Sequence, residues 1–130
     1  MLMPARRASA TAAPTNWSQL PHGEWLKEEL SHALAPHCAK IFGYYLVRVG
    51  HLAKSLEMPD LRVRHQFSAA KTGEADIQTD FEYWPFAEGV LDGVMMIGQL
   101  EFERDPHQVL REISRSLIAD GHLKIGRAHV

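Results

Sequence analysis

Metal-binding and nucleophilic side chains are the first candidates for chemistry in this sequence. It contains eight histidines and a single cysteine, Cys38. His32 and His37 lie five residues apart across Pro36, and no histidine pair has the H-x-x-x-H spacing that places two imidazoles on one helix face. Cys38 has no nucleophile signature around it, which favours a small buried side chain over a catalytic thiolate. The sequence therefore predicts neither a metal site nor a cysteine-based catalyst.

Aromatic and basic side chains are the next candidates, because they stack on bases or hold anions. Four aromatics lie close together, at Phe81, Tyr83, Trp84 and Phe86. The formal net charge is -2 and no basic patch accompanies these rings, so we interpret them as a packed loop and expect no nucleic-acid partner. Arg62 and Arg64 are interpreted as the solvent face of a strand, with a small anionic ligand as the alternative.

Bulk properties indicate one globular domain. The 130 residues allow a single core, and 45% apolar with 23% charged residues is ordinary for such a domain. A lone cysteine forms no internal disulfide, which favours a reducing cytoplasm. The longest apolar stretch, Val90–Ile97, is too short to cross a bilayer, so no membrane association is expected. Residues 1–16 are rich in Ala, Ser, Thr and Pro and are predicted to be a disordered arm.

Two helices must help to position any site. After Pro21, leucines at 26, 30 and 34 with Trp25 beside them form one apolar helical stripe, which we expect to end at Pro36. A short turn or second helix is expected through Ile41 and Phe42. Asp105 and Pro106 predict the start of a helix over HQVLREISRSLIAD, ending at Gly121, with its apolar face at Val109, Leu110, Ile113 and Leu117.

Strands alternate with these helices. YYLVRVG reads as a buried strand, followed by the short helix-compatible segment HLAKSLEM. LRVRHQFSA places Leu61, Val63, His65 and Phe67 on one side and predicts a half-buried strand. A turn at KTGE, a short strand at ADIQTD, a buried strand at VLDGVMMIG and a strand beginning at HLKI complete the pattern. The alternation predicts an α/β layered sheet.

The stretch from Ala75 to Leu123 resembles the class I S-adenosylmethionine-dependent methyltransferases of the type 11 group. The resemblance rests on ADIQTD, WPFAEGVLDGVMMI, DPHQVLREISRSL and ADGHL, in this order and at this spacing. It extends back to Trp17, because bacterial proteins of the group can begin with a similar W…L-P-x-G segment. The resemblance implies a partial Rossmann-like sheet over residues 17–123, mostly parallel, with helices on both faces and with the C-terminal strands missing.

The resemblance also implies a cofactor site for S-adenosylmethionine. Asp80 corresponds to the carboxylate that accepts a hydrogen bond from the adenine amino group, with a solvated loop residue as the alternative. Phe81 would offer its backbone N–H to the ring, and Gly98 and Gln99 would lie near the methionine part. Gly50 is the glycine retained from the loop that follows the first strand. Asp92 is expected to bind backbone at a strand start, and no residue is nominated as a catalyst.

Other positions depart from the family pattern. Arg48 stands where an acidic residue belongs, while Leu52 and Lys54 stand where glycines should let the backbone approach the cofactor. We expect the Leu52 side chain to intrude on the ligand's space. The second strand also offers no acid for the ribose hydroxyls.

These departures leave three functional hypotheses. The first is methyl transfer to an unidentified acceptor, the second is a non-catalytic binding or interaction module with the same architecture, and the third is an inactive fragment. The last residues, KIGRAHV, resemble read-through of a sequencing-library adapter, so residues 124–130 are expected to be a cloning or sequencing scar. The oligomeric state is left open.

Overall fold

The computed structural model describes residues 12–58 and 61–127. These residues form one parallel sheet of five strands in the order β3-β2-β1-β4-β5. The strands are β1 (Phe42–Val49), β2 (Arg62–Ala70), β3 (Ile77–Gln78), β4 (Leu91–Ile97) and β5 (Leu117–Gly126). The helices are α1 (Gly23–Cys38), α2 (His51–Ser55) and α3 (Pro106–Ser116), with 3-10 helices η1 (Trp17–Gln19), η2 (Phe81–Tyr83) and η3 (Leu100–Phe102). The predicted α/β Rossmann-like sheet is confirmed.

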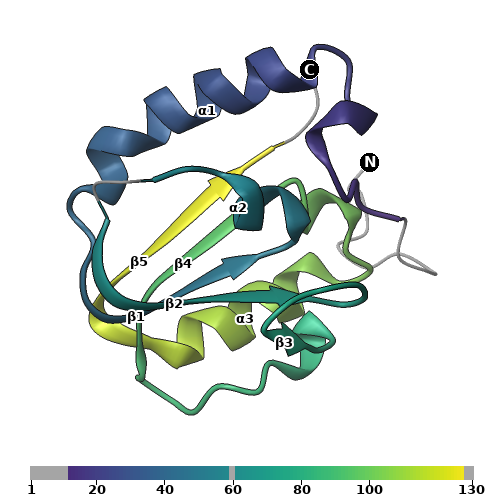
Figure 1. The fold of residues 1–130 in the computed structure, drawn as a ribbon. Helices are drawn as coiled ribbons and strands as arrows, with labels where there is room; N and C mark the ends of the chain where they lie inside the picture. Colours follow the sequence, from purple (N-terminus) through teal and green to yellow (C-terminus); the bar gives the residue numbers. More distant parts are fainter. Residues whose placement is uncertain (1–11, 59–60, 128–130) are drawn as a thin grey trace, which may run out of the picture.

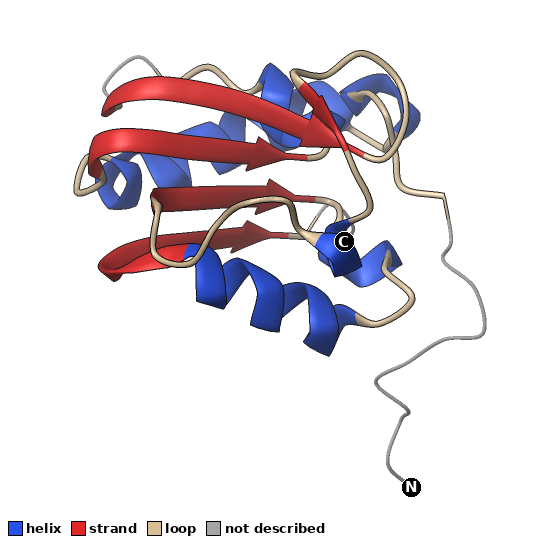
Figure 2. Ribbon diagram, turned by 90° about the horizontal axis from the view of Figure 1, so that it is seen from below, coloured by secondary structure: helices blue, strands red, loops and turns tan. Residues whose placement is uncertain are grey.

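Helices cover both faces of the sheet, as Figures 1 and 2 show. The leucine stripe of α1 packs with η1 and α2 over one face, where it covers Leu46 of β1 and Met95 and Ile97 of β4. On the other face, Val109 and Ile113 of α3 pack against Val47 and Val94. β4 and the second half of β1 are therefore buried on both faces, which is why these segments read as apolar runs.

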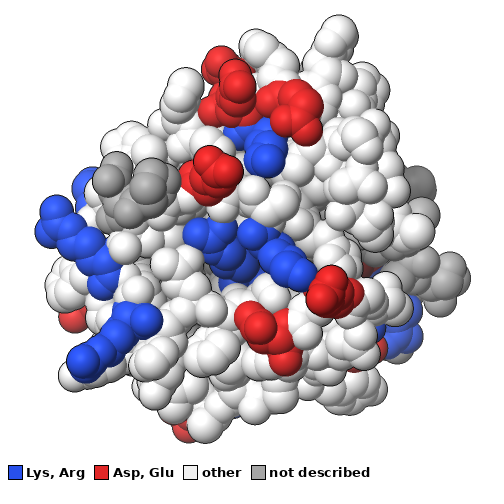
Figure 3. All heavy atoms as spheres, in the orientation of Figure 1, with Lys and Arg blue, Asp and Glu red and all other residues white. Residues whose placement is uncertain are grey.

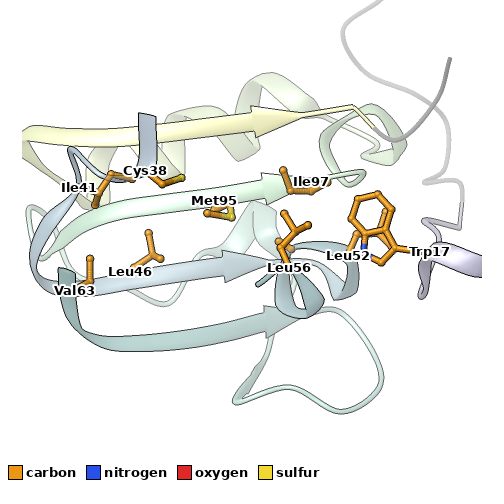
Figure 4. Packing of buried hydrophobic residues seen from close by; sticks show 10 residues of the cluster. Trp17, Cys38, Ile41, Leu46, Leu52, Leu56, Val63, Met95 and Ile97 are labelled. Carbon is orange, nitrogen blue, oxygen red and sulfur yellow. The ribbon is translucent and has the colours of Figure 1, made fainter. Parts of the chain in front are cut away.

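The first core cluster is shown in Figure 4, where Leu52, Leu56 and Trp17 gather at one end and Ile41, Cys38 and Val63 at the other. Trp17 is 3% exposed, and its indole N–H donates to Ser55 Oγ at 2.8 Å. Trp25, which the leucine stripe was predicted to include, is instead 62% exposed. The buried indole of this face therefore comes from η1 and not from α1.

Three predicted boundaries were wrong. Pro36 does not end α1: it lies in the last turn, and the helix continues to Cys38, with the Ala39 N–H donating to Ala35 O at 3.0 Å. Phe42 begins β1 and does not belong to a turn or helix. The third helix ends at Ser116, because its last carbonyls accept backbone hydrogen bonds from Gly89 and Val90 and the chain turns into β5.

The predicted half-buried strand β2 is less covered than expected. His65 is exposed and Phe67 is only partly buried, and both rings stack with Tyr45, at 5.6 and 6.1 Å between centroids. Tyr45 lies two residues before Val47 and therefore on the α3 face of the sheet. A loop over residues 71–76, not a helix, joins β2 to β3, and this part of the sheet stays open to solvent.

The starts of β1 and β4 are joined by Asp92. Its Oδ2 accepts hydrogen bonds from the N–H groups of Tyr44 and Tyr45, both at 2.9 Å. Arg62 and Arg64 are exposed on the neighbouring strand. The predicted backbone-binding role of Asp92 and the predicted solvent face of β2 are confirmed.

Lys124, Ile125 and Gly126 pair with β4 as the end of β5. The segment 124–130 therefore begins inside the sheet, and its origin as a scar stays a prediction. Within the predicted arm, residues 1–11 lie outside the described residues, and the Thr15 N–H donates to Gln19 Oε1 at 2.8 Å.

Leu52→Ala should lower the free energy of unfolding by about 3 kcal/mol, because it leaves a cavity beneath Trp17 and Leu56. Urea denaturation followed by tryptophan fluorescence measures this loss. Ile125→Ala is the matched control, since that side chain is 43% exposed, and it should change stability by no more than about 0.5 kcal/mol. Equal effects in the two variants would contradict the core assignment of Leu52.

Cys38 should resist alkylation in the folded protein. Cys38 is 2% exposed, and burial raises the pKa of its thiol, against a smaller lowering by Lys124 and Arg48. At about pH 8.5, where a free thiol is half ionised, we expect iodoacetamide to react about a hundredfold more slowly than with the urea-unfolded chain. Mass spectrometry over time measures both rates. Comparable rates would show that the thiol is accessible.

Candidate functional site

The direction of chain connection reverses between β1 and β4, because β2 follows β1 on one side while β4 and β5 continue on the other. Ligands of open parallel sheets bind beyond the carboxyl ends of strands at such a reversal. A cavity of about 320 Å³ lies there, lined by Ala12, Ala13, Pro14, Thr15, His51, Ala70, Lys71, Thr72 and Gln99. Its volume falls at the lower end of the range of about 300–1,000 Å³ for small-molecule sites. We call it the carboxyl-edge crevice.

Gly50 and Gln99 meet at this edge. Gly50 directly follows β1 with φ 89° and ψ 159°, a backbone conformation that essentially only glycine adopts. A Cβ on Gly50 would lie 3.0 Å from Gln99 Oε1. Gly98 has φ 58°, and its N–H donates to Gly126 O at 2.9 Å, which turns the chain after β4. The structure therefore brings three of the five predicted cofactor residues together.

The other two predicted residues, Asp80 and Phe81, follow β3 at the same edge but beyond β2. The Asp80 side chain is exposed, and its Oδ1 accepts from the Glu82 N–H at 3.1 Å as the cap of η2. Phe81 is fully buried, with its ring edge-on to Trp84 at 6.2 Å. Asp80 thus has a local capping role, and Phe81 fixes the loop to the core.

An ion pair between half-exposed Lys71 and buried Glu103 links these two groups of residues, and sequence reasoning missed it. Lys71 directly follows β2, and its Nζ lies 2.8 Å from Glu103 Oε2 and 5.8 Å from the centroid of the Phe81 ring. The Gln99 side-chain amide also donates to Glu103 Oε2, at 2.8 Å. Glu103 is 1% exposed, and its Oε1 has no hydrogen-bond partner among the described residues. We call this set the Lys71–Glu103–Gln99 network.

No motif in the sequence indicated that these three residues would meet. Lys71 was visible only as part of the predicted KTGE turn, and Glu103 only as a charge ahead of the Asp105-Pro106 helix start. They are 32 residues apart in sequence and meet because β2 and β4 flank β1. Lys71 directly follows the second strand, where the resemblance implied an acidic residue for the ribose hydroxyls.

Leu52 does not intrude on the crevice, so that prediction was wrong. Its side chain is fully buried in the core on the α1 face, next to Trp17 (Figure 4). Arg48 also turns toward α2, where its guanidinium donates to the carbonyls of Ala53 and Leu56. Burial lowers the pKa of Arg48, and these carbonyls at the helix end satisfy the charge.

Two further motif positions fasten the turn between β2 and β3. The His51 ring contacts Thr72 O at 2.7 Å, and Lys54 Nζ donates to Glu74 O at 2.7 Å. A Cβ on Gly73 would lie 3.0 Å from the His51 ring. The short helix α2 therefore holds the turn that carries Lys71.

The charged groups around α2 alternate in sign. A second hollow beside the turn is lined by Arg48, Lys54, Glu74 and Asp76 among others, and Asp76 accepts from the Ser68 N–H at 2.8 Å. Figure 3 shows basic side chains near the middle of this face with acidic side chains on either side of them.

Among the described residues, no group of three or more His, Cys, Asp or Glu side chains is placed to hold a metal, and no helix is long and apolar enough to cross a membrane.

Known proteins provide a separate line of evidence. The chain is 33% identical over 125 residues to the Escherichia coli K12 protein YafS, and this match covers 95% of the chain and 52% of YafS. The chain thus spans about half the length of this curated relative. A chain of the complex between the Haloferax volcanii Trm112 methyltransferase activator and a methyltransferase has a TM-score of 0.55 at 20% identity, with 75% of this chain and 52% of that chain covered.

A Methanococcus maripaludis protein described as an S-adenosyl-L-methionine-dependent methyltransferase gives a TM-score of 0.49 at 16% identity, with 92% of this chain and 67% of that one covered. The likeness to the Haloferax chain shows the fold alone. The sequence model of the family described as a methyltransferase domain matches residues 35–125, which is more than half of the chain. On that match, the chain belongs to this methyltransferase domain family.

Proposed function

We propose that the carboxyl-edge crevice binds S-adenosylmethionine and that the protein transfers its methyl group to an acceptor. The observation that carries this proposal is the meeting of Gly50 and Gln99 at the point where the strand order reverses. This is the edge at which parallel sheets bind ligands, and both residues had been assigned to the cofactor from the sequence. Membership of the methyltransferase domain family supports the same assignment.

The residues present fit such a cofactor in three respects. The glycine conformation at Gly50 leaves the end of β1 free of a Cβ. Leu52, at a family glycine position, packs into the core and does not obstruct the crevice. Glu103 presents a buried carboxylate oxygen without a partner among the described residues, and such groups are rare in native proteins unless a ligand or water satisfies them.

The chain's own residues would bind and orient the cofactor. Gly50, Gly98 and Gln99 would hold its amino-acid end, and Asp80 and Phe81 would lie at the adenine end, beyond β2. The cofactor supplies an activated methyl group, whose transfer in line to an acceptor depends mainly on alignment. No side chain is nominated as a general base. The lone buried thiol of Cys38 fits a cytoplasmic location, which we also propose.

S-adenosylhomocysteine should bind to the protein in calorimetric titration. Gly50→Ala should weaken this binding at least about tenfold, because a Cβ there strains the backbone and pushes the Gln99 side chain toward the cofactor. Gly89→Ala is the matched control. Gly89 also has positive φ, at 64°, but a Cβ there has nothing within 4 Å, so binding should not change.

Comparing the two variants separates an effect on binding at the crevice from a general effect of backbone strain. Equal weakening by both substitutions would show that strain, not the crevice, determines binding. If the unmodified protein gave no heat at millimolar S-adenosylhomocysteine, the cofactor proposal would fall and a non-catalytic binding module would take its place.

A further inference from the structure

Glu103 is the most unusual buried group among the described residues. Its side chain is 1% exposed, and its carboxylate pairs with a single cation, Lys71. The other carboxylate oxygen, Oε1, has no hydrogen-bond partner among the described residues. A buried carboxylate is stable only when its charge is paired and its lone pairs are used. Glu103 therefore has unused capacity to accept hydrogen bonds from a donor group.

Both partners of Glu103 line the carboxyl-edge crevice. Lys71 reaches it from the end of β2, and Gln99 reaches it from the end of β4, so the network spans the end of β1 between them. The Lys71 side chain is 31% exposed, and its flexible stem is free to leave toward solvent. The Gln99 amide would still hold Oε2 in place if Lys71 left.

Lys71 Nζ shows how a primary ammonium group meets this carboxylate, at 2.8 Å from Oε2. The amino-acid end of S-adenosylmethionine carries an ammonium group of the same chemistry. We propose that Glu103 is the receptor for that ammonium and that Lys71 is its intramolecular competitor, which occupies the Glu103 carboxylate when the cofactor is absent. This inference rests on the proposed cofactor function and assigns to it a residue outside the family motifs quoted above.

The proposal makes opposite predictions for the two members of the ion pair. Lys71→Met removes the competitor and should tighten S-adenosylhomocysteine binding about tenfold, while Glu103→Gln removes the receptor charge and should weaken it about tenfold. The second probe is 5′-methylthioadenosine, which has the same adenosine and thioether but no amino-acid end. Its affinity should stay within about twofold in both variants. Calorimetry and thermal unfolding with each probe measure these changes.

Lys40→Met is the matched control for loss of a positive charge. Lys40 is exposed just before the start of β1, at the opposite edge of the sheet, so its replacement should leave both affinities unchanged. If Lys71→Met fails to fold with Glu103 left unpaired, the double variant Lys71→Met/Glu103→Gln removes both charges and should bind S-adenosylhomocysteine as weakly as Glu103→Gln alone.

Different results would overturn the role of Glu103 and the cofactor function. Weaker or unchanged S-adenosylhomocysteine binding in Lys71→Met, or unchanged binding in Glu103→Gln, would overturn the role of Glu103 while leaving the cofactor site in place. Absence of S-adenosylhomocysteine binding to the unmodified protein would overturn the cofactor function itself.

Discussion

β1 hydrogen-bonds to β2 on one side and to β4 on the other, and the remaining elements are arranged around this pairing. Because both neighbours are parallel to β1, each connection has to cross a face of the sheet, and the crossing segments bury Leu46 on one face and Val47 and Val49 on the other. The same pairing places the ends of β2, β1 and β4 side by side. The carboxyl-edge crevice is a direct consequence of that order.

The segment after β1 combines a glycine of unusual conformation with a short helix. Gly50 has φ 89° and ψ 159°, and the next residues form α2. Arg48 binds carbonyls near the end of this helix, while His51 and Lys54 bind carbonyls of the turn between β2 and β3. His51 and Lys54 thus fix the turn from which Lys71 extends, and Leu52 joins the core.

The loop after β2 also has an effect on the far side of the sheet. With no helix over this region, the Tyr45, His65 and Phe67 rings stack on one another in partial contact with solvent. Stacking keeps part of each ring out of water without a covering element. Aromatic and β-branched residues predicted β2 as a strand. They lie in the strand that pairs with β1, and only some of them are buried.

The sequence by itself determined the order of the elements, the parallel α/β class and the family, because hydrophobic periodicity, turn residues and local motifs act over a few neighbouring residues. It also predicted the cap at Asp105 and the backbone-binding role of Asp92. The end of α3 and the burial of Trp17 in place of Trp25 required the tertiary structure, since they depend on contacts with distant segments. The Lys71–Glu103–Gln99 network was invisible for the same reason: its members come from different loops, and only the two-sided pairing of β1 brings their charges within hydrogen-bond distance.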